Sequence, residues 1–153
     1  MSNDDATRRA VLRTTTGLGA AALGLGSLSG SATAHYPEEL DVEVNPGFDG
    51  RIDLAGERFA VRVAPNEEHD PTGEMPGPHY NHTHYRAGTA DAVATGPRPE
   101  YAYRGLFHDG SVLLTFPLAD TGITTATDTV RLRWERHVGG SHGLSGTDEV
   151  TVE

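Results

Sequence analysis

The fold of this 153-residue chain is decided by the stretch Arg58-Phe59-Ala60-Val61-Arg62-Val63, in which apolar and polar side chains alternate. Successive side chains of a β-strand point to opposite faces, so the large apolar residues share one face and the two arginines lie on the other. The stretch Val130-Arg131-Leu132-Arg133-Trp134-Glu135 repeats the pattern. Both stretches are therefore predicted to be strands that bury one face against a core.

Shorter apolar segments surround these two strands. The segments that predict further strands are 41–44, 101–107, 111–116 and 150–152. Short strands separated by Gly and Pro, with no helical periodicity over more than about ten residues, predict an all-β fold. We expect an antiparallel immunoglobulin-like sandwich of about seven strands over residues 40–153. Its predicted core contains Phe59, Val61, Val63, Leu113, Phe116, Leu132 and Trp134.

Residues 65–99 interrupt the alternating pattern with six of the nine prolines and four of the eight histidines. They are predicted to be an irregular insertion, because connections of this length are usually functional or disordered. Within it His82 and His84 are two positions apart, so an extended segment would project both from one face toward one ion. The alternative is a solvated polar loop, and Asn81-His82-Thr83 also matches an N-glycosylation acceptor pattern.

The first 34 residues have the layout of a twin-arginine export signal. Arg8-Arg9 precede a charge-free stretch, and Ala32-Thr33-Ala34 provides a small-residue cleavage site. Residues 14–34 are rich in Gly, Ser and Thr, and they are too weakly apolar to hold a helix in a bilayer. We therefore predict a signal peptide over 1–34 and a single domain over 35–153. The mature chain is expected to begin at His35 and to lie outside the cell or at its surface, without stable membrane insertion.

The chain is strongly acidic, with 22 Asp and Glu against 12 basic residues, and all of the basic residues are arginine. This charge repels nucleic acid and anionic lipid, which argues against both as partners. The absence of lysine beside abundant Asp, Glu, Thr and Gly resembles the composition of haloarchaeal, salt-adapted proteins. No cysteine is present, so disulfides and thiolate metal sites are excluded.

The end of the chain resembles the CopC family of exported copper-binding proteins. The last hairpin of that family carries a Trp, a His and a Gly at the mutual spacing of Trp134, His142 and Gly146 here. Family members also commonly begin at a processed His and continue through a Pro-x-x-Gly turn into an alternating strand. This chain has His35, then Pro46 to Gly50 and then the strand at 58–63, so the similar pieces lie at the two ends of the predicted domain.

The resemblance implies a Cu(II) site formed by His35 and His142. An N-terminal His offers its amine and its Nδ1 to one metal, and a second imidazole adds to a nitrogen-rich set that suits Cu(II). The family also uses an Asp two residues before the second His, where this chain has Gly140. We expect a substitute ligand, either His82 or His84, or a carboxylate such as Asp148 or Glu149. Met75 alone cannot form a multi-methionine Cu(I) site.

The resulting prediction is a non-catalytic copper carrier or buffer, with the copper ion as its cargo and a membrane copper transporter as its partner. Two alternatives stay open. One is a small copper oxygenase that attacks polysaccharides, since such enzymes also use an N-terminal His. The other is a metal-free surface domain whose histidines are solvated loop residues. No Ser-His-Asp order, phosphate-binding glycine loop or paired-carboxylate motif supports a hydrolase.

Overall fold

A computed structural model describes residues 34–72 and 84–153, which form nine strands and no helix. The strands are β1 Asp41–Val44, β2 Arg51–Ile52, β3 Arg58–Ala64, β4 Tyr85–Gly88, β5 Tyr101–Tyr103, β6 Val112–Pro117, β7 Thr129–Glu135, β8 Gly143–Glu149 and β9 Thr151–Val152. Nothing helical in these two ranges is long and apolar enough to cross a bilayer. The predicted signal peptide, apart from its last residue, and the segment 73–83 lie outside the described residues.

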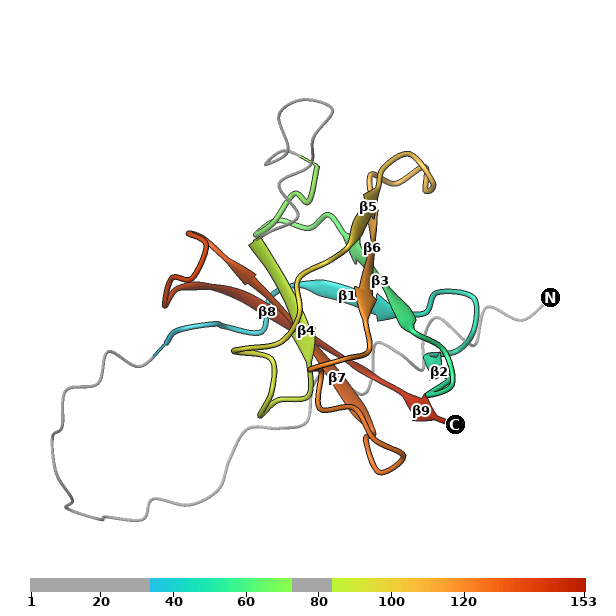
Figure 1. Ribbon diagram of the computed structural model, residues 1–153. Coiled ribbons are helices and arrows are strands. Elements are labelled where there is room, and N and C mark those ends of the chain that lie inside the picture. The colour runs from blue at the N-terminus through green and yellow to red at the C-terminus, as the bar shows by residue number, and fades with distance from the viewer. Residues whose placement is uncertain (1–33, 73–83) are drawn as a thin grey trace, which may run out of the picture. The chain divides into compact units, whose positions relative to one another are not determined.

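The strands build the predicted β-sandwich (Figure 1). One sheet has the order β1-β3-β6-β5 and the other β4-β7-β8, and all neighbours within these two sheets are antiparallel. A short parallel pair joins β2 to β9. Burying the apolar face of each sheet against the other removes both from water and forms one core.

The core follows the alternation seen in the sequence. Along β3 the buried residues are Phe59, Val61 and Val63, and the arginines face outward. The rings of Phe59 and Phe116 are paired across β3 and β6, with centroids 5.7 Å apart. The opposite sheet contributes Tyr85, Ala87, Val130, Leu132, Trp134 and Leu144.

The prediction that Leu113 belongs to the core is wrong. In β6 the buried residues are Val112, Leu114 and Phe116, whereas Leu113 faces outward and is only partly buried. Residues 113 and 116 are three positions apart, so a strand places them on opposite faces. The predicted core assigned both to one face, and Leu114 is the residue that belongs there.

Besides the two-residue β2, two strands were not predicted. β4 lies inside the region predicted to be irregular, pairs with β7 and is largely buried. Its sequence Tyr-Arg-Ala-Gly is too short to show alternation. β8 has the sequence Gly-Leu-Ser-Gly-Thr-Asp-Glu, with two glycines and two acidic residues that are disfavoured in strands. Both strands are specified by pairing with β7 rather than by their own propensity.

Candidate functional site

The segment that begins at His35 runs alongside β8 (Figure 1). The backbone N–H of His35 donates to the carbonyl of Ser141 over 2.8 Å, and the N–H of Gly143 donates to the carbonyl of His35 over 3.2 Å. These bonds make His35 and His142 partners in a parallel β-bridge. Bridged strands lie about 4.8 Å apart and their paired residues point to the same side, so both imidazoles start from neighbouring backbone positions. Both side chains are exposed.

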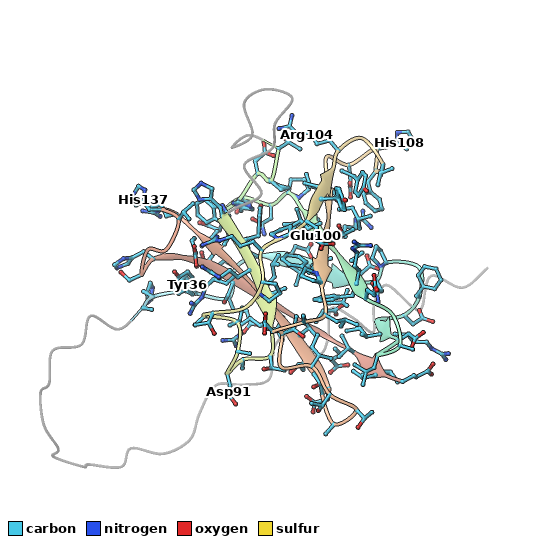
Figure 2. The ribbon with its side chains drawn as sticks, viewed as in Figure 1. Tyr36, Asp91, Glu100, Arg104, His108 and His137 are labelled. Carbon is cyan, nitrogen blue, oxygen red and sulfur yellow. The ribbon has the colours of Figure 1, made fainter. Side chains whose placement is uncertain are left out.

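Tyr36, which follows His35, binds this segment to the β7–β8 hairpin. Its hydroxyl donates to the carbonyl of Gly140 over 2.6 Å, and its own carbonyl accepts from the hydroxyl of Ser145 over 2.9 Å. The guanidinium of Arg133 lies 3.8 Å from the centre of the Tyr36 ring. Figure 2 shows Tyr36 near the end of β8 that leads into the β7–β8 loop. These contacts fix the backbone from which the His35 side chain extends.

Two glycines in this hairpin leave no room for a side chain. A Cβ at Gly143 would lie 1.8 Å from the carbonyl oxygen of Trp134 and 2.9 Å from the Tyr36 ring. A Cβ at Gly140, the position where the CopC pattern has Asp, would lie 2.8 Å from the carbonyl oxygen of His137. The local backbone therefore does not accommodate the missing carboxylate at residue 140.

A buried carboxylate holds the loop that leads to His142. The Glu135 side chain is 3% exposed and accepts from Arg86 over 2.8 Å, Arg98 over 3.0 Å and the backbone N–H of Gly139 over 2.7 Å. Burial alone would raise the pKa of Glu135, but these three hydrogen bonds outweigh it and lower the pKa overall. An ionised Glu135 thus links the loop to both arginines.

A cavity of about 770 Å³ opens between this hairpin and the loop after β3. His35, His69 and His142 line it, and Trp134 forms part of its wall. The remaining charged lining residues are Glu39, Glu68, Asp70 and Arg136. The cavity therefore combines three imidazoles with several exposed carboxylates, which is a donor set for a divalent cation.

His69 is the buried histidine of the cavity, with 5% of its surface exposed. Its Nε2 lies 2.7 Å from the Tyr85 hydroxyl, and its ring centroid lies 4.9 Å from that of Trp134. The side-chain oxygen of Asn66 accepts from the backbone N–H of His69, and the Asn66 amide donates to the carbonyl of Glu39. The His69 loop is thereby tied to the segment that carries His35.

Burial lowers the pKa of His69 to about 4, with Asp70 partly opposing the shift. The unfolded chain binds this proton more tightly, so the contribution to stability is complete above about pH 6.5 and decreases as the pH falls toward 4. For the metal-free domain we expect the free energy of unfolding to drop by about 3 kcal/mol between pH 7 and pH 4 from His69 alone. Urea unfolding of wild type and His69→Gln across this range measures it, and equal slopes for the two would contradict the expectation.

The other predicted ligands are placed differently. His84 donates from Nδ1 to the carbonyl of Glu135 over 2.6 Å and stacks on Trp134, but it is not among the residues that line the cavity. Asp148 accepts from the backbone N–H of Val44 at the far end of β8, where Glu149 is also located. His82 lies outside the described residues.

In residues 34–72 and 84–153, no three His, Asp or Glu side chains are grouped closely enough to hold a metal as they stand. The exposed imidazoles of His35 and His142 would have to rotate toward a common ion. No protein-family model matches the chain, and neither does any curated protein or solved structure.

Three residues that shape the cavity carried no signal in the sequence. His69 belongs to no motif, and Glu135 and Tyr36 read as ordinary strand and loop residues. Each of them has a partner that lies between 16 and 109 positions away in the chain. Only the folded backbone brings these groups together.

Proposed function

We propose that the domain is an exported Cu(II) carrier or buffer of CopC type, which holds its cargo between His35 and His142 once the chain is cut before His35. The parallel bridge between these two residues is the observation that carries the proposal, because side chains on neighbouring backbone positions can turn toward one ion. The exposure of both side chains supports transfer of the ion to a membrane copper transporter. The proposed role is binding and delivery, without catalysis.

The His35 nitrogen supports a chelate in this position. A free amine of this residue keeps two N–H groups and a lone pair when it is neutral. One N–H can retain the 2.8 Å bond to Ser141 while the lone pair binds Cu(II) together with Nδ1 of the same residue. Before cleavage the same nitrogen is a peptide amide, which has no such lone pair. Cleavage after Ala34 is therefore a precondition for the proposed site.

Replacement of the second imidazole tests the proposal. We expect His142→Ala to weaken Cu(II) binding by the domain 35–153 more than tenfold, which is over about 1.4 kcal/mol. The matched control is His108→Ala, because His108 is an exposed histidine on the β5–β6 loop, away from Tyr36 in Figure 2. Competitive titration against a chelator of known affinity measures both variants.

The outcomes are distinct. Weakened binding in His142→Ala with an unchanged His108→Ala supports the proposal. Equal losses in the two variants would point to adventitious binding by solvated histidines, and absence of tight binding by the wild type would leave a metal-free surface domain.

Because the proposed ligands must be deprotonated, binding should also release protons and weaken as the pH falls through the titration range of histidine.

A further inference from the structure

We infer that His69 is the third nitrogen ligand of this metal site, binding through Nδ1 in the place that a carboxylate occupies in the CopC pattern. This inference rests on the proposed function. It identifies a ligand on the loop after β3, and it gives Cu(II) three imidazoles and one amine. Such an all-nitrogen set favours Cu(II) over oxygen-preferring cations.

The cavity supplies the first argument. His69 lines the same cavity as His35 and His142, although it lies on a different loop of the sandwich. The hydrogen bond from Asn66 to the carbonyl of Glu39 joins that loop to the segment between His35 and β1. The three histidines are thus held on three backbone segments that are bonded to one another.

The orientation of the ring supplies the second argument. The hydroxyl of Tyr85 engages Nε2 of His69, and the described residues form no hydrogen bond to Nδ1. A tyrosine hydroxyl can accept from Nε2–H, which leaves the lone pair on Nδ1 for a metal. A hydrogen bond from the second ring N–H is the usual outer-shell support of a metal-binding histidine, and here the acceptor is the Tyr85 hydroxyl. Packing against Trp134 holds the ring in place, so ordering it on binding costs little entropy.

The competing donors are less suited to be the third ligand. The carboxylates of Glu39, Glu68 and Asp70 belong to exposed residues, and they can balance the charge of the bound cation without direct coordination. His84 packs on the same tryptophan but does not line the cavity. Among the described residues, His69 is therefore the fixed ligand toward which the two exposed imidazoles turn.

Pulsed electron paramagnetic resonance of the Cu(II)-loaded domain 35–153 tests the inference without any substitution. Electron spin-echo modulation from the remote nitrogens of bound imidazoles reports how many are coordinated. We expect three in the wild type. Two imidazoles, with tight binding intact, would overturn the inference and leave the proposed function standing. Absence of a tight Cu(II) signal would overturn both.

A matched pair of variants identifies the third imidazole. Loss of even an outer-shell partner commonly weakens metal binding by 10–100-fold. Removal of the direct ligand in His69→Gln is therefore expected to weaken Cu(II) binding at least about tenfold and to lower the imidazole count to two. His84→Gln is the control, since it removes a histidine that also packs on Trp134, and it should leave count and affinity unchanged. A count that stays at three in His69→Gln, or falls in His84→Gln instead, would overturn the inference. Circular dichroism verifies that both variants fold.

Discussion

Acetylation of the His35 amine is expected to weaken Cu(II) binding by the domain 35–153 at least about a hundredfold, which is about 2.8 kcal/mol. The modification is selective because the chain contains no lysine, so a domain that begins at His35 has a single amine. Hydroxylamine removes acetyl groups from tyrosine and leaves the amide. Mass spectrometry then verifies a single acetyl group before affinity is measured by chelator competition.

Acetylation tests the chemistry of the His35 nitrogen and is expected to leave the backbone pairing of this residue in place. An acetylated His35 nitrogen still carries one N–H, and that N–H can still donate to the carbonyl of Ser141. Pairing with β8 is therefore expected to survive while the lone pair is lost to the amide. Acetylated His35→Ala is the control, and the loss on acetylation should be smaller there than in the wild type, because without the His35 imidazole the amine can bind only as a single donor. Unchanged affinity of the wild type after acetylation would rule out the N-terminal chelate.

Trp134→Ala is expected to lower the free energy of unfolding by roughly 3–5 kcal/mol, because it leaves a large cavity between the two sheets. The indole is 7% exposed, packs with the rings of His69 and His84 and lines the candidate site. Urea unfolding of the metal-free domain measures the loss. Loss of the indole should also disturb the His69 ring that packs against it. Any change in Cu(II) binding by Trp134→Ala is expected to arise through that ring.

Leu113→Ala is the matched control for this substitution. Leu113 was expected in the core, but β6 turns it outward and buries Leu114 instead. Truncation of a partly exposed side chain should cost less than about 1 kcal/mol. A loss for Leu113→Ala as large as that for Trp134→Ala would contradict the register of β6 described here.

The strands that alternate strongly could be predicted from the sequence. β3 and β7 each have seven residues, and apart from Glu135 at the end of β7 their buried side chains fall where a period of two places them. β4 and β8 could not be predicted in this way. β8 contains glycines where the Tyr36 ring and the backbone of Leu40 approach it closely, and those neighbours are distant in sequence. Propensity is a local quantity, whereas pairing with β7 is not.

The candidate site likewise contains residues that could be predicted from the sequence and residues that could not. The sequence shows a His after the predicted cleavage site, a Trp-x₇-His spacing and a Gly at position 140, where the CopC pattern has Asp. The resemblance to that family indicated His35 and His142 as a pair. For the replacement ligand the sequence offers His82, His84, Asp148 and Glu149, and no local pattern distinguishes among them. In the structure His84 bonds to the carbonyl of Glu135 and Asp148 bonds to β1, whereas His69 lines the cavity with His35 and His142.

The amino-acid sequence is enough to establish the all-β class, the apolar faces of the main strands, the acidic character and the exclusion of thiolate chemistry. These properties depend on residue type and on periods of two, which need no knowledge of distant partners. The tertiary structure alone pairs His35 with His142, bonds Glu135 to the loop that leads to His142 and brings His69 into the lining of the same cavity. Such proximities arise when two sheets and their loops pack around one core, because packing joins residues that no local pattern connects.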